Sequence, residues 1–135
     1  MREYRLKIVT PEKIFFDDMV EQVIVRTSEG DIGILAGHEN YVADLASAPV
    51  KIKQNGKTRV SALSNGMIKV SENGVIILAT AIEWAEDIDI EWAKRSEQDA
   101  RNKIQQHESD RAFKNAELKL KRALNRISVH NSYNK

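Results

Sequence analysis

The sequence predicts an N-terminal all-β sandwich or flattened barrel followed by a C-terminal α-helical hairpin. Up to about residue 82, short apolar stretches alternate with polar residues at the period of two that is typical of strands. Asn-Gly pairs, which favour tight turns, separate several of these stretches. No glycine or proline occurs from residue 75 onward, and from residue 90 apolar residues recur every three or four positions. We therefore expect a β-sandwich domain at residues 1–84 and a two-helix domain at residues 85–135.

The β elements begin near the N-terminus, where Tyr4, Leu6 and Ile8 alternate with charged residues and predict a half-buried strand. Further strands are expected at 23–26, 32–35, 50–54, 60–63, 67–70 and 75–79. Each Asn-Gly pair between the last four is expected to form a hairpin turn: Asn55-Gly56, Asn65-Gly66 and Asn73-Gly74. Short, evenly separated strands of this kind favour a sandwich or a small barrel.

Two antiparallel helices are expected after the last strand. Either Asp87 or Asp89 can cap the first helix, and either Ser109 or Asp110 can cap the second. The apolar stripe of the first helix consists of Ile90, Ala93, Ala100 and Ile104, and that of the second of Phe113, Ala116, Leu120, Leu124 and Ile127. The tail after Val129 is polar and is expected to fray.

These helical stripes are narrow and rich in alanine. At about 25 cal/mol per Å² of buried apolar area, a lone hairpin would barely offset an ordering entropy of roughly 1–2 kcal/mol per residue. The hairpin must therefore pack on the β domain, pack on a partner, or switch between the two.

Composition excludes several classes of protein. Lys and Arg total 21 against 20 Asp and Glu, so bulk charge does not favour binding to nucleic acid or membrane. The absence of cysteine excludes disulfides, thiolate metal sites and a cysteine nucleophile. No apolar run approaches the roughly 18 residues of a membrane helix, and the start lacks the apolar region of a signal peptide.

Catalytic motifs are incomplete. His38-Glu39 begins like a zinc-binding HExxH motif, but Val42 occupies the position of the second histidine. Gly56-Lys57-Thr58 is like the end of a phosphate-binding loop, but Lys51 stands where that loop needs glycine. We therefore expect no catalytic residues, no metal site and no enzyme activity in this chain.

The second helix is the most basic stretch. Between Arg111 and Arg126 it carries six basic residues against one acid, Glu117. Either this is an ordinary solvated face, or it docks on an acidic protein surface. With Phe113 as its one aromatic residue, it is a poor candidate for binding nucleic acid. A second notable segment, residues 28–38, has three glycines around short apolar residues and predicts a turn, a strand and another turn, or a rigid contact end.

The whole chain resembles the epsilon subunit of bacterial F-type ATP synthases, called delta in mitochondria. The matching stretches, in the family's order, are LKIVTPE at 6–12, SEGDIGILAGH at 28–38, SNGMIKV at 64–70, AEDID at 85–89 and, as in Gram-positive members, LKRALNRI at 120–127. The resemblance implies a flattened ten-stranded sandwich and a two-helix hairpin. It also implies a non-catalytic rotor subunit with no required cofactor, in a proton- or sodium-translocating complex.

The resemblance further implies partners and a location. The subunit would lie in the central stalk with gamma and the c-ring, peripheral to the cytoplasmic face of the bacterial cell membrane and attached only through the complex. The residues implied to contact the c-ring and gamma are Glu29, Gly30, Asp31, Gly37 and His38. An extended hairpin would reach the alpha and beta subunits of the catalytic head and inhibit ATP hydrolysis, through Arg111, Lys114, Lys119, Arg122 and Arg126.

Some family members bind ATP between the hairpin and the sandwich through an Ile-Asp-x-x-Arg-Ala motif. Here residues 88–93 read IDIEWA, so Trp92 replaces the motif arginine and its indole cannot pair with phosphate. The remaining implied ATP-binding residues are Glu83, Ile88, Asp89, Ala93, Arg122 and Arg126. We expect weak or no ATP binding. The alternative function is a nucleotide-sensing module whose hairpin closes on ATP, and a generic β-domain adaptor is a third reading.

Overall fold

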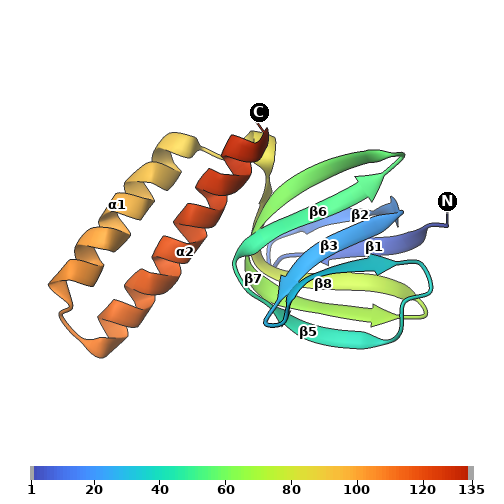
Figure 1. Cartoon of the computed structure of the whole chain (residues 1–135), viewed down its shortest axis with the longest axis horizontal. Helices are drawn as coiled ribbons and strands as arrows, with labels where there is room; N and C mark the ends of the chain where they lie inside the picture. Colours follow the sequence, from blue (N-terminus) through green and yellow to red (C-terminus); the bar gives the residue numbers. More distant parts are fainter. Residues whose placement is uncertain (1, 134–135) are drawn as a thin grey trace.

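The computed structural model describes residues 2–133. Over these residues it contains eight strands, one short 3-10 helix and two α-helices (Figure 1). In chain order they are β1 (Tyr4–Val9), β2 (Ile14–Val20), β3 (Gln22–Thr27), β4 (Gly30–Leu35), β5 (Tyr41–Leu45), β6 (Ala48–Gln54), β7 (Lys57–Ser71), β8 (Gly74–Trp84), η1 (Ala85–Asp87), α1 (Ile90–Gln106) and α2 (Asp110–Tyr133). This confirms the predicted fold class, a β-sandwich followed by a helical hairpin.

The strands form one hydrogen-bonded path that curls around an aliphatic core. The order is β2-β1-β8-β7-β6-β3-β4, and β5 pairs with β7 beside this path. All pairs are antiparallel except β1 with β8. Alternate side chains point inward, so that Leu6, Ile8, Ile68 and Ile77 are fully buried. The period-two pattern of the sequence is therefore the pattern of this core.

Strand β7 replaces two predicted strands and the turn predicted between them. Its first part pairs with β6 and its second part with β5, and the register against β8 shifts between Leu63 and Gly66. The prediction of a hairpin turn at Asn65-Gly66 is therefore wrong, because this pair lies inside the strand at a bulge. A Cβ on Gly66 would lie 2.1 Å from the Leu78 carbonyl oxygen. This glycine permits a close approach of two strands.

The other two Asn-Gly pairs do lie at hairpin turns. Asn55 and Gly56 both have positive φ, at 54° and 75°, as a type I′ turn requires. In the second pair only Gly74 has positive φ, and the turn itself falls on Glu72 and Asn73. Over the described residues there are eight strands rather than the implied ten. One reason is that residues 60–63 and 67–70, predicted as separate strands, are continuous.

The helix starts follow the predicted caps. The Asp89 side chain accepts a hydrogen bond of 3.0 Å from the backbone N–H of Trp92, and Ser109 Oγ accepts one of 3.0 Å from Ala112 N–H. Helix α1 ends at His107, which has a left-handed conformation. Helix α2 continues through residues 130–133, so the prediction that the chain frays after Val129 is wrong for these residues. Residues 134–135 lie outside the described range. Helix α2 continues because Val129 is buried against the sandwich.

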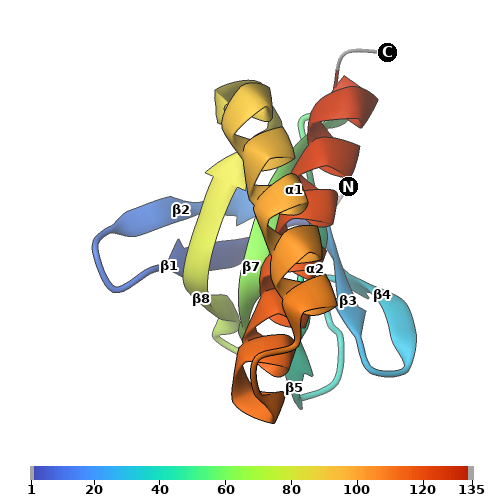
Figure 2. The ribbon, with the colours of Figure 1, turned by 90° about the vertical axis from the view of Figure 1, so that its left-hand side faces the viewer.

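The hairpin packs side-on against the sandwich, with α2 between α1 and the sheet (Figure 1). Figure 2, a view turned by 90° about the vertical axis, shows α1 and α2 side by side in front of the strands. The two helices face each other through small side chains: Ala93, Ser96, Ala100, Ala116 and Ala123. No helix in the described residues is long and apolar enough to span a membrane.

Candidate functional site

The junction between hairpin and sandwich is formed by the second half of α2. Asn125 Nδ2 donates a hydrogen bond of 3.0 Å to the Leu63 carbonyl oxygen. Arg126 Nε lies 2.5 Å from Glu83 Oε1. Val129, only 2% exposed, packs in a small apolar cluster. Its buried neighbours are Ala62, Ala85 and Ile88. In this conformation the hairpin therefore packs on its own β domain, one of the three arrangements that the sequence left open.

A cleft of about 530 Å³ opens beside this junction. Its walls come from the bulged part of β7, from β8 and from both helices: Ser64, Asn65, Thr80, Ala81, Trp92, Ser96, Lys119, Arg122 and Arg126. The lining contains three cationic side chains and no acidic one. The local field therefore favours an anion.

The predicted ATP-binding residues are divided by the fold. Arg122 and Arg126 line the cleft. Ile88 and Ala93 are buried, and the Asp89 carboxylate caps α1. The remaining one, Glu83, does not line the cleft but holds Arg126. Sequence reasoning missed Lys119 as a lining residue, because only the packing of α2 beside β7 turns it toward the same space.

Trp92 stands on the first turn of α1 at the mouth of the cleft. Its side chain is 48% exposed, and the Arg126 guanidinium lies 5.1 Å from its ring centroid. That distance fits a cation–π contact. The indole thus faces a guanidinium within its own chain.

The basic residues predicted to contact the catalytic head are not equally available. Arg111, Lys114 and Arg122 are exposed, and none of them has an ion-pair partner among residues 2–133. Lys119 binds Asp99 of α1, and Arg126 binds Glu83. The docked conformation therefore leaves Arg111, Lys114 and Arg122 on its open basic surface.

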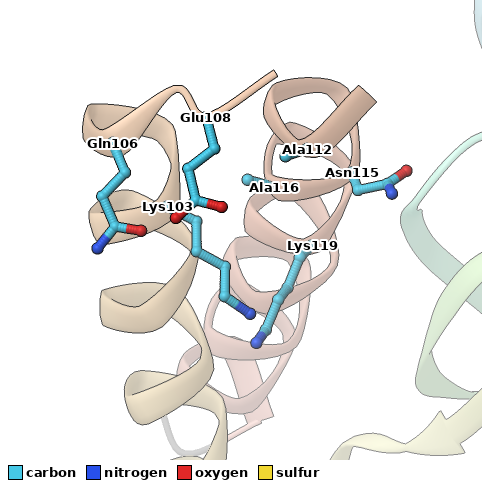
Figure 3. Close-up of a pocket in the computed structure, with 7 residues that line it drawn as sticks. All are labelled: Lys103, Gln106, Glu108, Ala112, Asn115, Ala116 and Lys119. Carbon is cyan, nitrogen blue, oxygen red and sulfur yellow. The ribbon is translucent and has the colours of Figure 1, made fainter. Parts of the chain in front are cut away.

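Asp99 clasps the two helices. Its carboxylate accepts a hydrogen bond from Lys119 on α2 and, at 3.2 Å, pairs with Lys103 on α1. The bond from Lys119, with a second from Lys103, holds the pKa of Asp99 below its usual value. Both lysines also border a cavity of about 340 Å³ at the tip of the hairpin (Figure 3). In that view their ammonium groups point toward the same space between the helices.

The residues predicted to contact gamma and the c-ring do not form one patch. Strand β4 runs from Gly30 to Leu35, so Glu29 and Asp31 lie near one end and His38 lies beyond the other. A strand separates the two turns of this segment, and their contacts with gamma and the c-ring stay a prediction. Arg26 pairs with Asp31 at 2.8 Å and lowers the pKa of that carboxyl.

A further surface was missed by sequence reasoning. Val42 on β5, Met67 on β7 and Leu78 on β8 are exposed large apolar residues. Met67 and Leu78 are paired directly across the strands, and Val42 lies on the next strand. Contiguous exposed apolar side chains are typical of protein contacts. The signal was present in the sequence, because Met67 and Leu78 alternate out of phase with the buried Ile68 and Ile77.

The same division into sandwich and hairpin appears in comparisons with known proteins. Residues 3–85 match the family described as ATP synthase, delta/epsilon chain, beta-sandwich domain, and residues 86–131 match its long alpha-helix domain. The chain belongs to the ATP synthase delta/epsilon chain family. As an epsilon-type member, it is a non-catalytic subunit of an ATP synthase.

Related proteins in the epsilon family match along nearly their whole length. The ATP synthase epsilon chain of Ruminococcus albus is 44% identical over 132 residues, covering 97% of this chain and 98% of the relative. That of Caldicellulosiruptor saccharolyticus is 40% identical, covering 96% and 94%. A chain in the cryo-EM structure of the Euglena gracilis mitochondrial ATP synthase superposes with a TM-score of 0.78 at 27% identity, covering 88% of this chain and 76% of that one.

Proposed function

We propose that this epsilon-type subunit couples ion-driven rotation of the c-ring to ATP synthesis in the catalytic head, and that its hairpin inhibits ATP hydrolysis. In this proposal the subunit binds gamma and the c-ring at the cytoplasmic face of a bacterial membrane. It is attached to the membrane only through the other subunits of the complex. The observation that carries the inhibitory part is the division of α2. Its second half grips the sandwich, whereas its first half presents exposed basic residues.

The sandwich offers two separate groups of candidate contact residues, which suits a subunit with two partners. Glu29, Gly30 and Asp31 lie near one end of β4, and Gly37 and His38 lie beyond the other. Because one rigid strand fixes their separation, a torque applied at one end is transmitted to the other. We propose these two ends, together with the apolar face around Met67, as the surfaces that meet the c-ring and gamma.

Inhibition would require the hairpin to leave the sandwich. Arg111, Lys114 and Arg122 are exposed already, whereas Arg126 and Lys119 become available only when their ion pairs with Glu83 and Asp99 break. An acidic surface on the catalytic head would then replace these internal acids as the partner of α2. Such an exchange of partners can shift the population of the two positions, because only differential contacts can do so.

The assembled ATP synthase tests both parts. Deletion of residues 85–135 is expected to raise ATP hydrolysis, since the basic helix is gone, while the sandwich still binds gamma. The double charge reversal Arg111→Glu with Lys114→Glu should raise hydrolysis in the same direction. Lys94→Glu, which reverses an exposed charge on α1, is the matched control and should change little. Unchanged hydrolysis in the deletion would refute inhibition and leave the coupling role, whereas loss of gamma binding by the bare sandwich would refute the coupling role.

The cationic cleft supports a second candidate, a nucleotide-sensing module. Lys119, Arg122 and Arg126 could meet phosphate groups, and the exposed face of Trp92 could stack on a base. Calorimetry of the full chain with Mg-ATP separates the candidates. We expect at most millimolar binding, because Trp92 brings no charge and Arg126 is already paired. Micromolar binding that Arg122→Ala abolishes would favour the sensor instead.

A further inference from the structure

We propose that Arg126, held between Glu83 and Trp92, is a latch that keeps the hairpin on the sandwich with this chain's own side chains alone. This inference goes beyond the coupling and inhibitory roles, because it concerns the position of the hairpin in the free subunit. It rests on the contacts that one guanidinium on α2 makes with two other elements, β8 and α1.

Arg126 connects the parts of the chain that must stay together in the docked position. Its Nε lies 2.5 Å from Glu83 Oε1 at the end of β8, before the linker between the domains. Its guanidinium also lies 5.1 Å from the ring centroid of Trp92 on α1, after the linker. Since Arg126 itself belongs to α2, one side chain ties both helices to the sandwich. If the hairpin moves away from the sandwich, the ion pair between Arg126 and Glu83 must break, and Arg126 must leave its place beside the cleft.

The pivot of such a swing is short and well defined. Trp84 is fixed to the sandwich, because its ring stacks on Phe15 at 4.6 Å and carries the Arg59 guanidinium at 3.6 Å from its centroid. Helix α1 begins at Ile90 behind its Asp89 cap. Motion is therefore confined to residues 85–89. Glu83 lies just before this pivot and Arg126 after it, so their ion pair spans the pivot, and Trp92 orients the guanidinium from within the hairpin.

The ion pair lies where solvent screens it only partly. The Arg126 side chain is 19% exposed and the Glu83 side chain 33%. The Trp92 ring lies against the guanidinium, which leaves the charge attracted to the ring face as well as to the carboxylate. An arginine in place of Trp92 would set two guanidinium groups against each other and would need an added anion to hold them. The indole removes that requirement.

The other docking contacts described within residues 2–133 are modest. They include one hydrogen bond from Asn125 and an apolar cluster in which two members are alanines. The Ala62 side chain is 4% exposed and shares that cluster with Val129 of α2, so departure of the hairpin would uncover it. A thiol at that position therefore reports undocking through its rate of alkylation.

The test uses the full chain carrying Ala62→Cys, since the sequence has no other cysteine. Removing the latch with Arg126→Ala, Trp92→Ala or Glu83→Gln should speed alkylation about tenfold each, which corresponds to about 1.4 kcal/mol. Trp92→Phe keeps a ring and should retain most of the protection. Arg122→Ala, the neighbouring arginine without an ion-pair partner among residues 2–133, should change the rate less than about twofold.

Two further measurements keep the result interpretable. A thiol in the sandwich core, from Val23→Cys, should react equally slowly in every latch variant, which separates undocking from unfolding. Spin labels on Lys51→Cys and Gln105→Cys give an independent distance between sheet and hairpin tip. The proposal is overturned if Arg126→Ala matches Arg122→Ala, or if Mg-ATP slows alkylation of the unmodified latch more than about tenfold, a change of about 1.4 kcal/mol. Neither result depends on the behaviour of the assembled synthase.

Discussion

The sandwich and the hairpin are held together by different forces. The sandwich closes over large aliphatic side chains from most of its strands, and its backbone pairing is continuous from β2 to β4. The hairpin closes over alanine and serine, and a few contacts at one end of α2 attach it to the sheet. The difference separates two tasks, because a rigid base can transmit force while a weakly attached arm can change position.

The largest effect is expected in the sandwich core. Ile68→Ala empties a fully buried position on β7 and should lower the free energy of unfolding by about 2–5 kcal/mol. Leu124→Ala on the half-exposed side of α2 is the hairpin counterpart and should cost less than about 1 kcal/mol. Urea unfolding followed by Trp84 fluorescence in a Trp92→Phe background measures both. Equal losses would show that the sandwich core and the hairpin do not differ in this way.

Overpacking of the helix interface is expected to affect the arm alone. Ala100→Leu inserts a larger side chain between α1 and α2 at a fully buried position and should destabilise the hairpin by about 1–3 kcal/mol. Hydrogen exchange of the helix amides should accelerate, whereas exchange in the strands should not. Faster exchange in β8 as well would show that the two regions unfold together.

The helix cap gives a smaller effect at the start of the arm. Asp89→Ala removes the acceptor for the Trp92 N–H and should weaken α1 by about 1 kcal/mol. Asp87→Ala is the control, because Asp87 lies in η1 and makes no such cap. Helix content by circular dichroism should fall on warming only for Asp89→Ala.

The pH dependence of the Asp99 clasp is the smallest expected effect. Its pKa is lowered from the ordinary 3.8 in the folded chain, chiefly by the hydrogen bond from Lys119. A lowered folded pKa adds stability that is present above 3.8 and is lost as the pH falls through the folded pKa. The melting temperature of the hairpin should therefore drop below about pH 4, and Asp99→Asn should flatten that drop. An unchanged profile in Asp99→Asn would show that the clasp contributes nothing.

Much of the fold could be predicted from local patterns. The alternation around Leu6 and Ile8, the two helices and the caps at Asp89 and Ser109 are properties of neighbouring residues, so the sequence carries them directly. The predicted apolar stripe of the second helix was wrong at Leu124, which is 40% exposed, whereas Ala123 and Val129 are buried. Strand β2 was not predicted, because its stretch IFFDDMV has no clean alternation. The prediction of a turn at Asn65-Gly66 failed because the same dipeptide fits either a hairpin turn or a bulge where two paired strands approach closely.

The candidate site was only partly accessible in this way. Arg122 and Arg126 could be singled out from the basic run. That Arg126 is paired and Arg122 is not, within residues 2–133, depends on tertiary packing, which places Glu83 at the end of β8 beside Arg126. Likewise, Glu29 and His38 stand close in sequence yet lie at opposite ends of a strand.

By itself the sequence determined two folding units and the basic character of the last helix, because hydrophobic period and charge are read residue by residue. Only the tertiary structure decided where the hairpin lies, which of its charges are paired, and that Trp92 meets Arg126. These are contacts between residues far apart in the chain. Their energies depend on geometry that no local pattern carries.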